Sequence, residues 1–90
     1  MIELQFVKKG MMRKVFIRDR KITMITPEMN YQPLELDINK AARFQDENMT
    51  RLLKEIGMDN FEKYTDDNVI AKDIIDDFEK SKWRCIKGNG

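Results

Sequence analysis

The chain has 90 residues, of which 41% are hydrophobic and 37% are charged, and its formal net charge at pH 7 is +1. It contains no histidine and a single cysteine, Cys85, which excludes an intrachain disulfide and a cysteine-built zinc site and removes the commonest general base. No apolar run approaches the roughly 20 residues of a membrane span, and no signal-peptide core is present. We therefore expect a cytoplasmic protein that does not enter the membrane.

The first part of the chain predicts an antiparallel sheet. Ile2, Leu4 and Phe6 alternate with polar residues, which is the period of a half-buried strand. Three further runs of strand-forming residues follow, over 13–18, 22–26 and 34–38. Short polar turns between the first three runs favour a meander. Pro27 is expected to end the third run, because proline has no amide hydrogen for a strand ladder.

After residue 38 the apolar spacing becomes helical. Asn39 is a plausible N-cap, and the weak helix formers at 46–48 predict a kink or a restart of the helix. Gly57 has the position of a left-handed C-cap residue, with Met58 closing over Leu53 as in a Schellman motif.

A short helix and a longer acidic one are expected to follow. Asp59 and Glu62 resemble a capping box for a short helix ending at Tyr64, and Thr65 is a suitable N-cap for the acidic helix. The fold class is then α+β, a small antiparallel β-meander packed against two or three bent or kinked helices.

The length predicts one domain over residues 1–90. Residues 1–38 are expected to be mostly β, residues 39–82 mostly α, and residues 83–90 a short strand or docked tail. Trp83 is one of the residues that would dock this last segment.

The acidic helix is the candidate metal site. Asp73, Asp76 and Asp77 have i, i+3 and i+4 spacing and share one patch of helix surface, with Asp66 about two turns away on the same side. Calcium takes about six to eight oxygen ligands, so loop carbonyls or water would have to complete the shell. The glycine of an EF-hand loop is missing. These four aspartates predict loose binding of a divalent cation, calcium; the alternative is a solvated helix face that keeps the protein soluble.

Two family resemblances bear on function. From Phe44 onward the spacing resembles the SAM domain, with residues 56–58 similar to its Leu-Gly-Leu corner and Asn68 with Ile70 similar to its Asn-x-Ile turn. This resemblance implies a protein–protein interaction module that lacks the last helix of the family. In its length, strand-then-helix order and acidic helix, the whole chain resembles a small α+β calcium-binding protein type of methanogenic archaea, which implies calcium binding by the acidic helix.

The first hairpin is strongly basic. Its cations are grouped around Phe16 in the sequence, and they are Lys8, Lys9, Arg13, Lys14, Arg18, Arg20 and Lys21. A basic sheet face with an exposed aromatic is typical of proteins that bind single-stranded nucleic acid. Exposed strand faces are often basic for solubility alone, and a helix could cover Phe16, so nucleic acid is not the favoured partner.

Nothing in the sequence indicates catalysis. There is no glycine-rich phosphate loop and no nucleophile next to a base. Adjacent aspartates such as Asp76 and Asp77 point about 100° apart on a helix. The sequence thus predicts a non-catalytic binding domain that holds calcium loosely; the alternatives are a SAM-like interaction module and, third, a binder of single-stranded nucleic acid.

The metal prediction is checked by thermal unfolding. Calcium at constant ionic strength should raise the melting temperature, and a millimolar site needs tens of millimolar calcium to add about 1–2 kcal/mol. Magnesium should act more weakly because it dehydrates reluctantly. Replacing Asp73 and Asp77 together with asparagine should abolish the response; identical responses of wild type and double variant would contradict the prediction.

Overall fold

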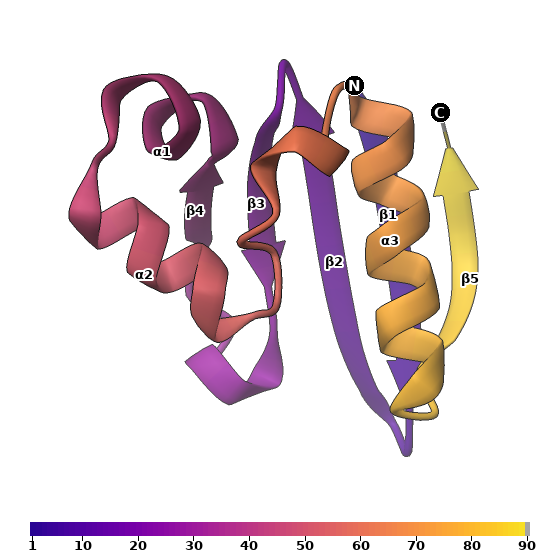
Figure 1. The fold of residues 1–90 in the computed structure, drawn as a ribbon. Helices are drawn as coiled ribbons and strands as arrows, with labels where there is room; N and C mark the ends of the chain where they lie inside the picture. Colours follow the sequence, from indigo (N-terminus) through magenta and orange to yellow (C-terminus); the bar gives the residue numbers. More distant parts are fainter. Residues whose placement is uncertain (90) are drawn as a thin grey trace.

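A computed structural model describes residues 1–89 of the chain and contains one five-stranded antiparallel sheet with the strand order β4-β3-β2-β1-β5. The first four strands follow one another as a meander, and the last strand returns to pair with β1 (Figure 1). The strands are β1 (Ile2–Lys8), β2 (Met11–Arg18), β3 (Lys21–Ile25), β4 (Leu34–Asp37) and β5 (Arg84–Asn89).

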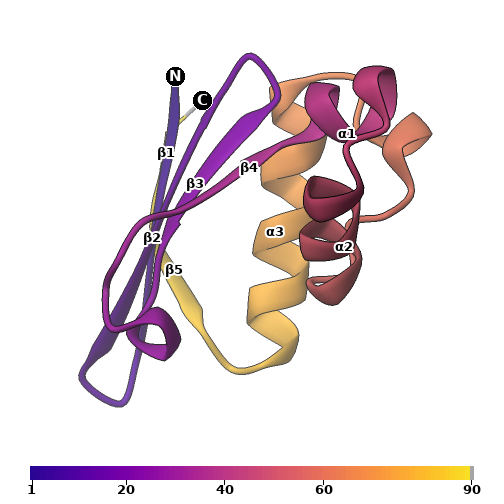
Figure 2. The ribbon, with the colours of Figure 1, turned by 90° about the vertical axis from the view of Figure 1, so that its left-hand side faces the viewer.

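The helical elements lie on one face of this sheet (Figure 2). They are α1 (Ile38–Phe44), α2 (Glu47–Glu55) and α3 (Asp67–Lys80), with 3-10 turns η1 (Pro27–Met29) and η2 (Phe61–Lys63). α3 packs on β1, β2 and β5, whereas α2 packs on β4 and α1. The predicted α+β class, a small meander with helices packed on it, is confirmed. Within residues 1–89, no helix has the length and apolar character needed to cross a membrane.

The strand alternation decides which side chains enter the core. Leu4, Phe6, Val15 and Ile17 point toward the helices and are almost completely buried. Their neighbours on the other side of each strand line a sheet face that no helix covers. The core thus lies in a single layer between the sheet and the helices.

Two helix caps differ from those predicted. Asp37, not Asn39, caps α1, because its carboxylate accepts a hydrogen bond from the backbone N–H of Lys40 at 3.1 Å. Asp66, not Thr65, caps α3 and accepts from the backbone N–H groups of residues 68 and 69. Aspartate is the stronger N-cap in the second case, and both helices start at the residue after it.

The predicted capping box of Asp59 and Glu62 is also absent. This segment forms the 3-10 turn η2, whose N-cap, Asn60, makes no side-chain capping bond. The expected short helix ending at Tyr64 is therefore a single tight turn, and Tyr64 follows it as one of the most deeply buried side chains.

The predicted restart between the first two helices is confirmed. Gln45 has a left-handed backbone with φ of 51°, and Asp46 then caps α2 through the backbone N–H of Met49 at 2.9 Å. After this break α2 packs on β4 and on α1.

The Schellman motif is confirmed as well. Gly57 has φ of 79°, its N–H donates to the carbonyl of Lys54 at 3.0 Å, and the N–H of Met58 donates to the carbonyl of Leu53 at 2.8 Å. Met58 and Leu53 are both buried.

The last segment was expected to be a strand or a docked tail, and β5 is a strand of the sheet. Trp83 precedes it and is buried, with 4% of its surface exposed. Gly90, the final residue of that expectation, lies outside the described residues.

Asp67 joins the start of α3 to the turn between β2 and β3. Both turn residues, Asp19 and Arg20, have left-handed backbones with φ of 52° and 62°. Their N–H groups donate to the two carboxylate oxygens of Asp67 at 3.0 Å and 2.7 Å. The N–H of Ile38, at the start of α1, donates to the carbonyl of Arg20 at 3.1 Å. The turn is thereby held by two helices.

Removing this carboxylate should destabilise the fold. We expect Asp67→Ala to lower the free energy of unfolding by about 1–3 kcal/mol, because two backbone donors lose a charged acceptor. Chemical denaturation measures this loss. Asp76→Asn, a change in the same helix at an exposed carboxylate, serves as the control and should stay within about 0.5 kcal/mol of wild type. Equal effects of the two variants would contradict the role assigned to Asp67.

Candidate functional site

An open groove of 840 Å³ lies between α2 and α3 on the helix side of the sheet. It lies there because the two helices pack on different strands, α2 on β4 and α3 on β1, β2 and β5 (Figure 1). Strands β2 to β4 form its floor, and η1 lies at one end. The turn at Gly57 ends the α2 wall, since the Schellman motif directs the chain away there.

The interior of the groove is apolar and rich in methionine. Met24 and Met58 line it and are buried, with 7% and 3% of their surfaces exposed, whereas Met29 lies 47% exposed at the η1 end. Leu52 and Ile56 of α2 add half-buried side chains to the same lining. Methionine side chains are flexible and polarizable, so such a lining adapts to apolar groups of different shape.

The charged residues around the groove are mainly acidic. Five acidic residues line it against three basic ones. Two of the basic residues have partners, since Arg13 pairs with Glu28, and Lys63 with Asp73. The acidic residues that form no ion pair within residues 1–89 are Glu55 of α2 and Asp76 and Asp77 of α3. Both walls therefore carry free acidic residues, and the α3 wall also carries one basic residue without an ion pair within residues 1–89, Lys80.

Arg13 closes the end of the groove near the C-terminus of α3. Its guanidinium stacks on the rings of Phe78, 4.6 Å from the centroid, and Trp83, at 4.2 Å. Arg13 also forms the ion pair with Glu28, and this hydrogen bond holds the pKa of the Glu28 carboxyl below its ordinary value. The Nε atom of Arg13 is buried and has no hydrogen-bond partner among the described residues.

Two of the cations that were predicted to surround Phe16 lie on the other side of the sheet. Arg13 lies opposite Phe6 in the β1–β2 register and so points into the helix side, not toward Phe16. Lys8 also points to this side, where its Nζ donates to the carbonyl of Ser81 at 2.7 Å. A positive charge at that carbonyl stabilises the C-terminal end of α3, because the negative end of the helix dipole is there.

Asp73 is occupied by protein partners. Its carboxylate accepts from Lys63 Nζ and from the Tyr64 hydroxyl, both at 2.7 Å. Burial alone would raise the pKa of Asp73, but these two hydrogen bonds outweigh it, so the pKa lies below its ordinary value. Burial, together with the hydrogen bond to Asp73, raises the pKa of Tyr64.

The four aspartates of the predicted metal site do not form a ligand cluster. Asp66 is engaged as the N-cap of α3 and Asp73 with Lys63 and Tyr64, while Asp76 and Asp77 line the groove. Within residues 1–89, no group of three or more potential ligand side chains is placed to hold a metal ion. Calcium binding at these four residues stays a prediction.

The sequence reasoning did not identify the α2 wall or the methionine lining. A signal was present, because Gly57 and Met58 were recognised as a helix end and the chain has seven methionines. Their convergence on one groove depends on the distance between two helices that are separate in sequence, which periodicity does not report.

Comparison of the chain with protein-family models, curated proteins and solved structures finds no match. Neither of the two resemblances drawn from the sequence gains support from it. The residues after Phe44 form helices packed on a sheet, and their last segment is β5.

The contacts of Asp73 predict a pH-dependent contribution to stability. A carboxyl whose pKa is lowered on folding stabilises the protein above the unfolded pKa, about 3.9, and loses this effect as the pH falls through the folded value. Asp73→Asn should therefore cost about 1 kcal/mol at neutral pH. Denaturation in a series of buffers should show the cost fading below about pH 4. A cost that stays constant into strong acid would mean that the neutral hydrogen bond to Tyr64, rather than the charge, carries it.

Proposed function

We propose that this chain is a non-catalytic binding domain whose groove between α2 and α3 takes a basic, amphipathic segment of a partner protein. The observation that carries the proposal is the combination of an apolar floor with free acidic side chains on both walls. A segment with apolar residues on one side and lysine or arginine at its edges matches both features.

The lining of the groove supports this mode, and the groove has a volume of 840 Å³. Its lining comes from β2, β3, β4, α2 and α3 and from the turns beside them, which include η1, η2 and the turn at Gly57. Met24, Met29 and Met58 provide an adaptable apolar surface, as in other proteins that bind amphipathic helices.

Charge repulsion within α3 gives a reason for the partner to be basic. Asp73, Asp76 and Asp77 are close neighbours on one helix, and like charges at these spacings destabilise a helix. Lys63 compensates Asp73. Cationic side chains of a partner would compensate Asp76 and Asp77, whereas a calcium ion would need further oxygen ligands beside them.

A reducing, cytoplasmic setting fits this domain. Cys85 is a free thiol, half-buried in β5, and small extracellular domains more often depend on disulfides.

The methionines supply the test, since they divide between the groove and the rest of the molecule. A protein labelled at its methionine methyl groups is titrated with a synthetic peptide of leucine and lysine, about 14 residues long, with leucine at helical spacing. We expect NMR shifts at Met24, Met29 and Met58. Met11 and Met12, which lie outside the groove, should not move. Shifts at Met11 and Met12 without shifts in the groove would contradict the proposal.

Matched variants separate charge from apolar contact. A peptide with glutamate in place of lysine should bind much more weakly, because the walls repel it. Asp77→Asn should weaken binding of the basic peptide several-fold and increase its salt tolerance. Asp66→Asn changes the same charge at the capping position outside the groove and should leave the peptide affinity unchanged. Equal affinity for both peptides would refute the electrostatic part of the proposal.

A further inference from the structure

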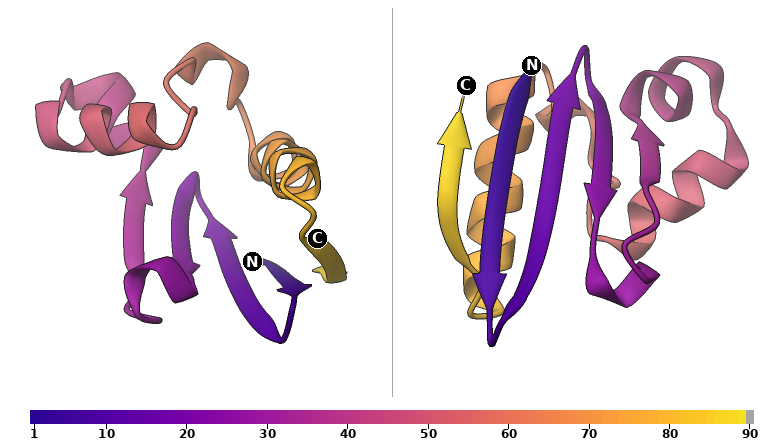
Figure 3. Two further views of the ribbon diagram at one scale, coloured as in Figure 1. Left: turned by 90° about the horizontal axis from the view of Figure 1, so that it is seen from below. Right: turned by 180° about the vertical axis from the view of Figure 1, so that it is seen from behind.

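The sheet face opposite the helices is open. Seen from that side, the strands lie in front of α3 and no helix crosses them (Figure 3). Phe16, on the central strand β2, lies on this face, half-buried, with Glu3 and Thr23 opposite it on the two neighbouring strands. Among the residues that the structure describes, it is the only aromatic one that the strands place on this face.

Basic side chains flank Phe16 on its own strand. Lys14 and Arg18 are two residues away on either side, so they share its face and lie about 13 Å apart along the strand. Lys21 of β3 is directly opposite Arg18 in the register. Like charges placed directly opposite each other destabilise a sheet. Two acidic residues offset this, since the carboxylate of Asp19 is 3.7 Å from Arg18 Nε and Asp37 of β4 lies opposite Lys21.

The open face as a whole is basic. The register places five basic and three acidic residues on it. The basic ones are Lys14, Arg18, Lys21, Arg84 and Lys87, and the acidic ones are Glu3, Glu35 and Asp37. Lys87 pairs with Glu3 at 3.1 Å, whereas Lys14 forms no ion pair within residues 1–89.

The geometry points to a second binding site on this face, for single-stranded nucleic acid. We infer that a base stacks on Phe16 and that phosphates contact Lys14, Arg18 and Lys21. A single strand is required because the bases of a duplex are paired and stacked, so none is available to the Phe16 ring. The other apolar residues here, Val7, Met12 and Ile25, are half-buried; Val7 lies opposite Met12, and Ile25 lies opposite Lys14. The site is independent of the acidic groove, which lies on the other side of the sheet.

The test uses fluorescence anisotropy with a labelled oligothymidine of about 15 nucleotides, near the upper site size of small single-strand binders. Binding at low salt should weaken with added salt, and each phosphate contact contributes about 0.7 to the slope of log K against log salt. Lys14→Ala should lower the affinity and reduce this slope by about that amount. Phe16→Leu should lower the affinity about 5- to 150-fold, which is the range expected for loss of one stacked base.

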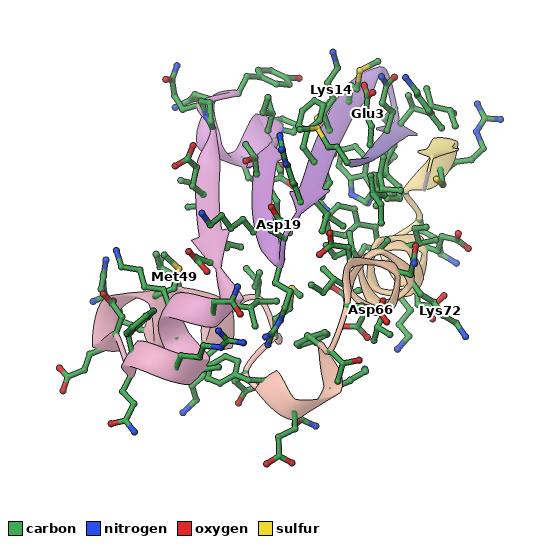
Figure 4. The ribbon with its side chains drawn as sticks, turned by 90° about the horizontal axis from the view of Figure 1, so that it is seen from above. Glu3, Lys14, Asp19, Met49, Asp66 and Lys72 are labelled. Atoms are coloured by element: carbon green, nitrogen blue, oxygen red, sulfur yellow. The ribbon has the colours of Figure 1, made fainter. Side chains whose placement is uncertain are left out.

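Two variants serve as controls. Phe16→Tyr keeps an aromatic ring and should bind nearly as wild type, so a loss in Phe16→Leu alone reports stacking and not misfolding. Lys72→Ala removes one positive charge from α3, away from Lys14 (Figure 4), and should change neither affinity nor slope. The inference is overturned if the oligonucleotide does not bind at low salt, if duplex DNA binds as tightly, or if Lys72→Ala weakens binding as much as Lys14→Ala. The leucine–lysine peptide should still shift the NMR signals of the groove methionines when the oligonucleotide is bound. Either proposal, for the groove or for the open face, can therefore be refuted without the other.

Discussion

The turn between β2 and β3 is where the sheet and both groups of helices are joined. Asp67 brings the start of α3 to this turn through two hydrogen bonds, and the N–H of Ile38 brings the start of α1 to it. Asn39 adds a side-chain contact with Arg20 at 2.8 Å. Away from this turn, α2 and α3 pack on different strands of the sheet. The groove lies between these two helices.

The fold also places positive and negative side chains on different faces of the domain, which the net charge does not reveal. A net charge of +1 suggests an electrostatically neutral protein. In the folded chain, Glu55 of α2 and three aspartates of α3 line the groove, while basic residues of β2, β3 and β5 other than Arg13 lie on the open face of the sheet. Charges of opposite sign on opposite faces attract different partners and keep each from the wrong surface. The proposed protein partner and nucleic acid would thus meet different sides of one small domain.

Local patterns in the sequence were enough for the architecture but not for the groove. Alternation identified the first four strands, and Gly57 identified the end of α2, because both depend on neighbours in sequence. The last segment was expected only as a strand or a tail. The alternation also indicates that Arg13 shares the buried face with Val15 and Ile17. The prediction of a basic surface around Phe16 included Arg13 and was wrong in this respect. The partners of Asp73 could not be predicted, since Lys63 and Tyr64 reach it only through the shape of the η2 turn.

The pairing of β1 with β5 affects how the chain is made. β1 leaves the ribosome well before β5, yet one of its edges is paired only by residues 84–89. Until those residues emerge, a nascent chain presents an unpaired strand edge next to exposed apolar side chains such as Phe6, a combination that recruits other chains. Trp83 must also be synthesised before the Arg13 guanidinium can stack on its ring. Chains that end just before β5 lose only a small part of the core. They should nevertheless aggregate far more readily than that loss suggests.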